Sequence, residues 1–321
     1  MLAAKRKDLN KSTKIWLNYV LGGAISALLL WGIYEQVIKQ LEKVDMNTLW
    51  DTGPWYLLST VVILMPINVA LEAWKWQLLA NSAQPTTYRQ AFMSYIAGIA
   101  FSIVTPNRIG EYPGRLIYMQ RKNTTRLVAV SVLGSVAQLL TLFVYGCMGL
   151  AYYNIAFSGS IALLLLIGCI MVTIITFIAY WRFDTWIPLI GKIKWLRRYN
   201  VYGKLLGRFT DKQQAKVLMI SLLRYAIYTA QYLILLRWMN VMMPPLEGFF
   251  MSALFFWVIA VVPSVALVEL GARGSLGIFL FGHFSANTIG ILTATFGIWC
   301  INLAIPSVVG SLMIARAKLV R

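Results

Sequence analysis

The sequence is poor in the side chains that enzymes most often use for catalysis. Its 321 residues include one histidine and three cysteines, and only 12% of them are charged. One histidine cannot supply a metal cluster or a set of acid and base roles, and the sequence has no HExxH, P-loop or nucleophile-elbow motif. We therefore expect no catalytic residues, no metal site and no cofactor, and we expect that the protein is not an enzyme.

Acidic residues are also scarce, since 11 aspartates and glutamates stand against 29 lysines and arginines. The net charge of +18 could indicate a nucleic-acid partner, but the cations cluster around long apolar stretches, which is the pattern of membrane topology. Hydrophobic residues make up 59% of the chain, and Leu127 to Trp181 runs for 55 residues without a charge. The composition therefore predicts a polytopic membrane protein with no nucleic-acid partner.

Lysine and arginine are concentrated in three segments. Five precede residue 15, nine lie from Arg182 to Lys216, and three lie from Arg316 to the C-terminus. Because short loops rich in lysine and arginine stay in the cytoplasm, we expect both termini there. The basic segment 182–216 is either an element lying on anionic headgroups or an ordinary cytoplasmic loop. The apolar start lacks a small-residue cleavage site before Glu35, so we expect it to remain as the first span.

The apolar stretches differ in length. Six are long enough to cross a bilayer, at about 15–34, 54–74, 127–152, 159–181, 217–240 and 286–313. Residues 91–104 would form a helix of only ~21 Å, against a hydrocarbon core of ~30 Å, and residues 248–283 are interrupted by Pro263. We therefore expect an all-α membrane protein with six full transmembrane helices and two re-entrant helical hairpins.

Two charged motifs interrupt the apolar sequence and resemble each other. One runs from Pro106 to Arg115 and the other from Pro263 to Arg273, and each ends in Glu-x-x-x-Arg. The surrounding charges place both ends of the first hairpin on the cytoplasmic side and both ends of the second on the outer side. The sequence therefore predicts one membrane domain, 1–321, with an inverted repeat whose copies cover about 54–152 and 217–313.

The motifs combine helix breakers with charges at membrane depth. A glutamate four residues before an arginine shares its helix face and can pair with it. Proline and glycine break the helix and leave backbone N–H groups beside a cation, which suits a phosphate or carboxylate headgroup. The candidate pathway residues are Arg108, Glu111, Arg115, Arg224, Glu269 and Arg273, and the candidate hairpin residues are Pro106, Asn107, Gly110, Pro263 and Gly271.

Other readings of these charges remain open. Each Glu/Arg pair is alternatively a structural lock that touches no substrate. Arg224 shares a face of its span with Gln231 and is expected to face the bundle interior. Glu72 is either its counterpart or a residue at headgroup level. Lys75 and Arg237 lie beside tryptophans near predicted span ends, so we expect their amino and guanidinium groups to reach the interface.

The segments Asn68-x3-Glu72-x2-Lys75-Trp and Gly98-x7-Pro106-Asn-Arg-x-Gly-Glu111-x3-Arg115 carry a family resemblance. They resemble the transmembrane, flippase-like region of bacterial lysylphosphatidylglycerol synthases and of stand-alone relatives. Arg115 lies one residue later than in the family motif, and the second motif matches only loosely. The resemblance extends over about 15–313. It implies a fold with re-entrant helices in the bacterial cytoplasmic (inner) membrane that moves a lipid between leaflets, and we expect no aminoacyl-transferase domain.

We therefore expect a flippase-like transporter for a lipid with an anionic or zwitterionic headgroup. Its partners would be membrane lipids, with anionic headgroups at the cytoplasmic face, and a homo-oligomer is left open. Arg108, Arg115 and Arg273 would contact the headgroup, while Glu111 and Glu269 would hold or release these arginines. Two other classes stay open: a membrane enzyme or accessory protein acting on a lipid-linked sugar or phosphate, with Glu111 or Glu269 as base, and a small-solute secondary transporter.

Overall fold

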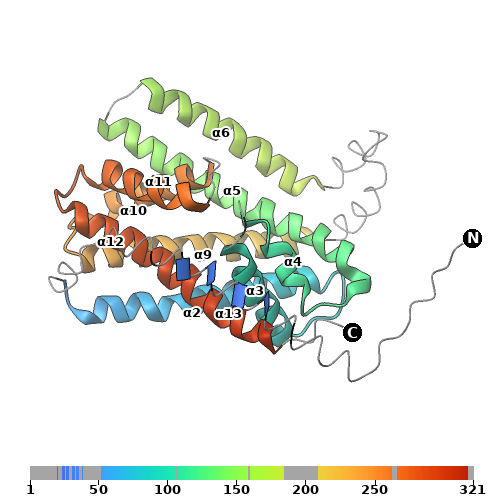
Figure 1. Ribbon diagram of the computed structural model, residues 1–321. Helices are drawn as coiled ribbons and strands as arrows, with labels where there is room; N and C mark the ends of the chain where they lie inside the picture. The colour runs from blue at the N-terminus through green and yellow to red at the C-terminus, as the bar shows by residue number, and fades with distance from the viewer. Residues whose placement is uncertain are drawn as a thin grey trace, which may run out of the picture.

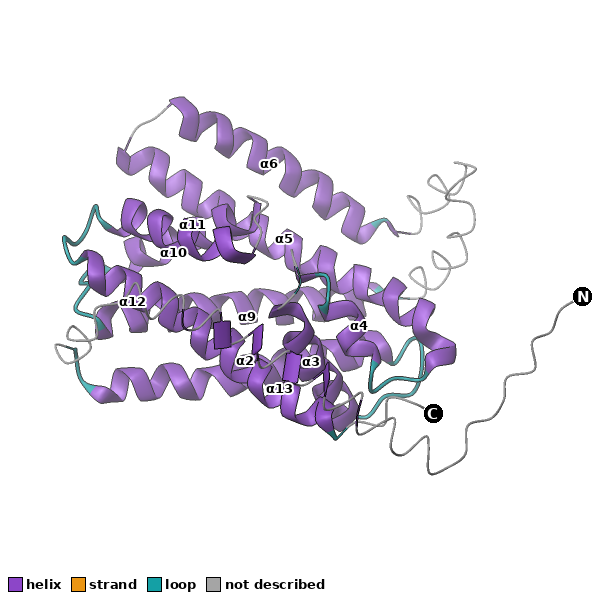
Figure 2. Cartoon of the chain, in the orientation of Figure 1, coloured by secondary structure: helices purple, strands orange, loops and turns teal. Residues whose placement is uncertain are grey.

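The fold consists of helices that lie side by side in an elongated bundle (Figure 1). The computed structural model describes residues 52–103, 105, 108–157, 160–183, 209–261 and 266–316, with isolated positions between 20 and 38; the side chains of 266–271 are not described. Within these residues there are helices and loops and no strand (Figure 2). The predicted all-α class is confirmed.

Five helical stretches are long and apolar enough to cross a membrane. They are α2 (Trp55–Ala80), α5 (Thr124–Phe157) with the short turn before it, α6 (Ser160–Trp181), α9 (Asp211–Trp238), and the combined stretch of α12 (Thr288–Trp299), η5 (Cys300–Ala304) and α13 (Ile305–Ala315). Each matches a predicted span. The first predicted span, 15–34, lies mostly outside the described residues, as does the basic segment 182–216. These helices indicate a multi-pass membrane protein.

Four shorter helices form two pairs. They are α3 (Tyr88–Ile103), α4 (Glu111–Leu116), α10 (Pro245–Val261) and α11 (Ala266–Phe281). The longest has 17 residues, or ~26 Å at 1.5 Å per residue, which is less than the ~30 Å of a hydrocarbon core. Helix α4 packs against α3, and α11 packs against α10. Figure 1 shows the first pair toward one end of the bundle and the second pair toward the opposite end.

The two halves of the chain pack in a reciprocal way. Helix α2, which begins the first half, packs against α9, which begins the second. The short helix α3 of the first half packs against α13, the last helix of the second half. In the same manner, α10 of the second half packs against α5 of the first, while α6 packs mainly on α5 at the edge of the bundle (Figure 1). The short helices α3 and α10 therefore each pack against a helix of the opposite half.

The last span contains a helical irregularity that follows from its sequence. Residues Cys300–Ala304 form a π-helical turn, and Pro306 lies in the first turn of α13. Proline has no backbone N–H, so it cannot donate to the carbonyl of Asn302 four residues earlier. A π-helical turn is a common way to absorb such a defect, and these turns are frequent at functional sites. This turn lies beside the cavity described next.

Candidate functional site

A cavity of about 600 Å³ lies where the two halves of the chain meet. The lining residues come from α2, α3, α4, α5, α9, α10, α11, α12, the π-helical turn and the loop between α3 and α4. One part of the lining is polar or charged, and another is aromatic or aliphatic. The lining includes Asn68, Tyr95, Arg108, Glu111, Gln138, Arg224, Tyr225, Tyr228, Phe256, Ile259, Arg273, Trp299 and Asn302. The cavity is therefore amphipathic.

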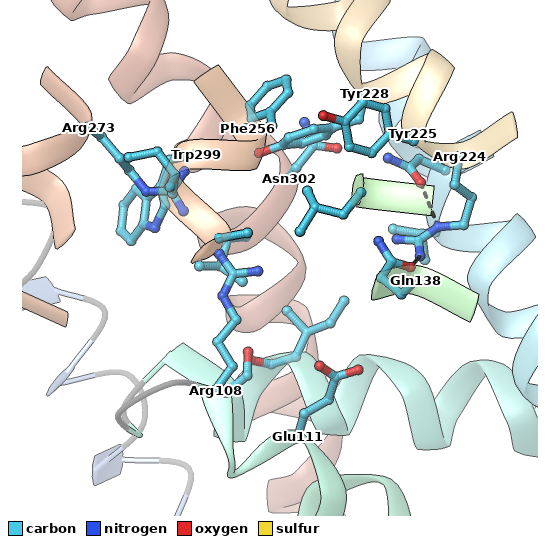
Figure 3. A pocket seen from close by; sticks show the side chains of 18 of the residues that line it. Arg108, Glu111, Gln138, Arg224, Tyr225, Tyr228, Phe256, Arg273, Trp299 and Asn302 are labelled. Carbon is cyan, nitrogen blue, oxygen red and sulfur yellow. Dashed lines mark hydrogen bonds between the residues drawn. The ribbon is translucent and has the colours of Figure 1, made fainter. Parts of the chain in front are cut away.

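Four of the six predicted pathway residues line this cavity. Arg108 and Glu111 come from the first motif, Arg273 comes from the second, and Arg224 comes from the middle of α9. Figure 3 shows Arg108 and Arg273 reaching toward one region from different directions, with Arg224 across the cavity. The two motifs, which are far apart in the sequence, therefore contribute arginines to the same cavity.

The loop between α3 and α4 has an unusual backbone. Arg108 has a φ of 56°, in the left-handed region that non-glycine residues seldom adopt and that costs roughly 1–2 kcal/mol. A Cβ atom on Gly110 would lie 2.4 Å from the carbonyl oxygen of Phe101, so a larger residue does not fit there. The Gly110 N–H donates to Thr105 Oγ1 at 2.8 Å. This turn directs Arg108 toward the cavity, while Pro106 and Asn107 lie outside the described residues.

Two glycines allow α4 to lie directly on α3. A Cβ atom on Gly114 would lie 2.7 Å from the carbonyl oxygen of Ala97, and one on Gly98 would lie 2.8 Å from Cγ of Arg115. Any side chain at either position would push the two helices apart. This close contact holds Glu111 and Arg115 of the first motif near α2 and α3.

Glu72 of α2 is the centre of a buried charge cluster. Its carboxylate forms ion pairs with Lys75 at 2.7 Å, with Arg115 at 3.0 Å and with Arg224. Arg115 also pairs with Glu111, four residues before it, as the spacing predicted. One carboxylate thus connects α2 with α4 and α9.

Arg115 occupies a different place from Arg108. Its guanidinium lies 5.0 Å from the ring centre of Trp76 and 5.2 Å from that of Tyr95, and the residue is buried. It is not among the residues that line the cavity. The guanidinium is held by two carboxylates and two rings. The expectation that Arg115 contacts a headgroup stays a prediction.

Arg224 is fixed by several partners. Its Nε donates to Asn68 Oδ1 at 2.8 Å, and its Nη1 donates to Gln138 Oε1 at 3.3 Å as well as to Glu72. Arg224 faces the bundle interior, as predicted. Glu72 was expected to be either the partner of Arg224 or a residue at headgroup level, and the structure shows that it is the partner of Arg224. The side chain of Arg224 also lines the cavity.

The expectation for Lys75 is wrong. We predicted that its amino group reaches the interface, but the residue is 2% exposed. Its Nζ donates to Gln138 Oε1 at 3.2 Å and to Ser221 Oγ at 3.3 Å, besides its ion pair with Glu72. The reason is that α2 continues to Ala80, so Lys75 lies within the helix and not at its end. Arg237, by contrast, is exposed at the end of α9.

The second motif is described only in part. Glu269 and Gly271 lie on the backbone of α11, but their side-chain environment is outside the described residues, as is Pro263. Arg273 is 6% exposed and lines the cavity. The expected pairing of Glu269 with Arg273 therefore stays a prediction.

Several lining residues were not predicted from the sequence. The aromatic wall of Tyr225, Tyr228, Phe256 and Trp299 is spread over three helices, so no local pattern marks it. Gln138 and Asn302 carried a usable signal, because each is an amide within a predicted span and such groups seldom face lipid. Among the described residues, no three His, Cys, Asp or Glu side chains cluster in a way that could hold a metal ion.

One of three comparisons with known proteins found a match. A family model described as the lysylphosphatidylglycerol synthase TM region matches residues 19–310. No curated protein and no solved structure matches the chain. The family match includes both charged motifs and every helix that lines the cavity. The chain therefore belongs to the lysylphosphatidylglycerol synthase transmembrane-region family.

Proposed function

We propose that this protein moves a lipid with a polar headgroup between the two leaflets of the membrane, and that the cavity holds the headgroup during transfer. The observation that supports this proposal is that one cavity between apolar helices is lined both by arginines and by the aromatic wall. The arginines are Arg108, Arg224 and Arg273. Charged side chains at membrane depth are costly and usually mark a substrate pathway.

The dimensions of the cavity support a headgroup as its occupant. Binding pockets for small molecules measure about 300–1,000 Å³, and this cavity of about 600 Å³ is within that range. A headgroup in this space would meet guanidinium and amide groups on one side and rings on the other. Its acyl chains could remain in the surrounding lipid, which lowers the energetic cost of moving the whole molecule.

The packing of the two halves supports a transport cycle. We propose that α3–α4 and α10–α11 are re-entrant hairpins that enter from opposite faces, as in transporters with inverted repeats. The reciprocal contacts of α3 with α13 and of α10 with α5 favour this arrangement. Rocking of one half against the other would then open the cavity alternately toward each leaflet. We place the protein in the bacterial inner membrane with both termini in the cytoplasm.

The proposal is tested by reconstitution of the purified protein into liposomes with a fluorescent phospholipid. Dithionite quenches label in the outer leaflet only, so the rate of further quenching reports movement between leaflets. We expect the wild-type protein to move the labelled lipid faster than it moves in protein-free liposomes. The rate for Arg273→Gln should be at least tenfold lower than the wild-type rate. The matched control is Arg237→Gln, because Arg237 is exposed at the end of α9 and lines no part of the cavity. A wild-type rate equal to that of protein-free liposomes, for every phospholipid tried, contradicts the proposal.

A further inference from the structure

We propose that Asn68, Tyr95 and Gln138 form a donor wall of the cavity, in which two amide NH2 groups and one hydroxyl group bind the phosphate of a phospholipid. The donor wall would bind the phosphodiester that glycerophospholipids share, whatever group lies beyond it. This inference rests on the proposed function, because it assigns the part of the lipid that the wall contacts. It follows from the hydrogen bonds that fix the direction of each polar group.

Two cations fix the orientation of the Gln138 amide. Lys75 Nζ donates to Gln138 Oε1 at 3.2 Å, and Arg224 Nη1 donates to the same oxygen at 3.3 Å. Ammonium and guanidinium groups are donors only, so the atom that they share must be the amide oxygen and not the nitrogen. Gln138 is an exposed residue that lines the cavity beside Arg224 (Figure 3). The NH2 group of Gln138 is therefore turned away from the two cations.

Asn68 is oriented by the same arginine. Arg224 Nε donates to Asn68 Oδ1 at 2.8 Å, which again assigns the oxygen to the cation and leaves the NH2 group. Asn68 lines the cavity, and its nitrogen is not fully buried. Among the residues that the structure describes, neither Asn68 Nδ2 nor Gln138 Nε2 has a hydrogen-bond partner. Two amide donors are therefore available to a ligand.

Tyr95 adds a third donor to this wall. Arg224 Nη2 donates to the hydroxyl oxygen of Tyr95 at 3.5 Å, and Tyr95 also lines the cavity. Because the oxygen faces the guanidinium, the hydrogen of the hydroxyl group is directed elsewhere. Each oxygen of the donor wall thus accepts from a cation of the buried cluster. The groups that remain for a ligand are neutral donors.

A wall that offers only donors suits a group that offers only acceptors. The two unesterified oxygens of a phosphodiester accept hydrogen bonds and donate none, and asparagine, glutamine and tyrosine side chains commonly donate to phosphodiester oxygens in nucleic-acid complexes. A sugar hydroxyl or a free amine also brings hydrogens, which this wall would leave without an acceptor. The donor wall therefore fits the phosphate of a phospholipid better than it fits a sugar or an amine.

Other parts of the cavity suit other headgroup features, and the experiment has to separate them. Glu111 and Asn302 line the cavity with side-chain oxygens, and they lie on α4 and on the π-helical turn, apart from the donor wall. These oxygens suit the hydroxyl groups of a sugar. The aromatic wall suits a quaternary ammonium group. The lipids compared must therefore differ in phosphate, in ammonium and in hydroxyl groups.

The first test measures the thermal midpoint of the wild-type protein in a neutral detergent as short-chain lipids are added. Phosphatidylcholine and a glucosyl diacylglycerol with the same acyl chains both lack a net charge, and only the first has a phosphate. We expect phosphatidylcholine and phosphatidylglycerol each to stabilise the protein at concentrations at least tenfold lower than the glucosyl lipid. Stabilisation by all three at equal concentrations overturns the donor wall. A preference for phosphatidylcholine alone assigns the effect to its ammonium group and also overturns the donor wall.

The second test separates the donor of Gln138 from its acceptor. Gln138→Glu keeps an oxygen for Lys75 and Arg224, so the midpoint without lipid should stay or rise, while the donor is lost. Gln138→Met loses the donor without adding a negative charge. Both variants should need at least threefold more phosphatidylcholine for half-maximal stabilisation. A loss in Gln138→Glu alone would indicate repulsion by the new charge and would overturn the donor role.

The matched control is Gln90→Glu. Gln90 is an exposed amide whose oxygen accepts from the backbone N–H of Thr87, and it lines no part of the cavity. This variant should need the same concentration of phosphatidylcholine as the wild-type protein, and an equal loss in it would overturn the assignment to Gln138. Size-exclusion profiles identify any variant that is unfolded, and the comparison of lipids with the wild-type protein needs no variant at all.

The outcomes distinguish this inference from the proposed function. If lipids move in liposomes but phospholipids and the glucosyl lipid stabilise equally, the donor wall is overturned and the proposed function stands. If no lipid moves, the proposed function is overturned, while a tenfold preference for phospholipids in binding still supports the donor wall. Glycerophosphocholine carries the same phosphodiester without acyl chains. If it stabilises the protein as strongly as phosphatidylcholine does, the lipid is overturned as the source of the phosphate, and weaker stabilisation supports the lipid.

Discussion

Glu72, which is buried, and Arg224, which is partly buried, form an ion pair that joins α2 to α9 across 152 residues of sequence. Helix α2 opens the first half of the chain and α9 opens the second, so this pair connects the two halves beside the cavity. Because the same carboxylate also holds Lys75 and Arg115, its loss affects three cations at once.

Glu72→Gln should therefore destabilise the protein strongly. Removing one partner of a buried ion pair typically costs about 3–5 kcal/mol, since the remaining charge has no counter-ion. The thermal midpoint of the purified protein in detergent measures this loss. The control is Glu247→Gln at the start of α10, where loss of a charge in the first helical turn costs only about 0.3–1 kcal/mol. Equal midpoints for the two variants would show that Glu72 does not organise the cluster.

Gly114→Ala should separate α4 from α3. The new Cβ atom would lie 2.7 Å from the carbonyl oxygen of Ala97, and overpacking of this kind costs about 1–3 kcal/mol. The matched control is Gly168→Ala on α6, where no atom lies within 4 Å and the gain in helix propensity is about 0.5–1 kcal/mol. We expect the midpoint to fall for the first variant and to stay or rise for the second. A rise for both variants contradicts the close contact of the two helices.

Arg108→Gly should separate stability from function. Glycine adopts a positive φ without strain, so the substitution relieves roughly 1 kcal/mol at a residue whose φ is 56°. It also removes a guanidinium from the cavity. We expect an unchanged or higher thermal midpoint together with a rate of lipid movement at least tenfold lower. A variant that is as active as the wild-type protein would show that Arg108 has no part in the pathway.

The local features of the fold could be predicted from the sequence. Five spans and the helix breaks near both motifs follow from apolar length and from proline and glycine positions. The pairing of Glu111 with Arg115 follows from their spacing on one helix. Such predictions succeed because each depends on residues that are close together in the chain.

The contacts between distant segments could not be predicted in this way. Glu72 and Arg224 are brought together by the packing of α2 on α9, and no spacing rule records that packing. For Lys75 the error was one of helix length. The apolar stretch appeared to end at residue 74, but α2 continues to Ala80. Inside the bundle the charge of Lys75 is paired with Glu72. A charge near the end of an apolar stretch therefore does not by itself mark the membrane interface.

The most direct test of the cavity as a headgroup site is a structure determined by electron microscopy in nanodiscs that contain phosphatidylglycerol. We predict headgroup density in the cavity next to the guanidinium groups of Arg108 and Arg273, with acyl-chain density leading out of the cavity into the bilayer. The matched comparison is the Arg108→Gln, Arg273→Gln double variant in the same nanodiscs, in which this density should be lost. A well-resolved wild-type cavity without headgroup density, with lipids ordered only on the outer surface of the helices, would contradict the account.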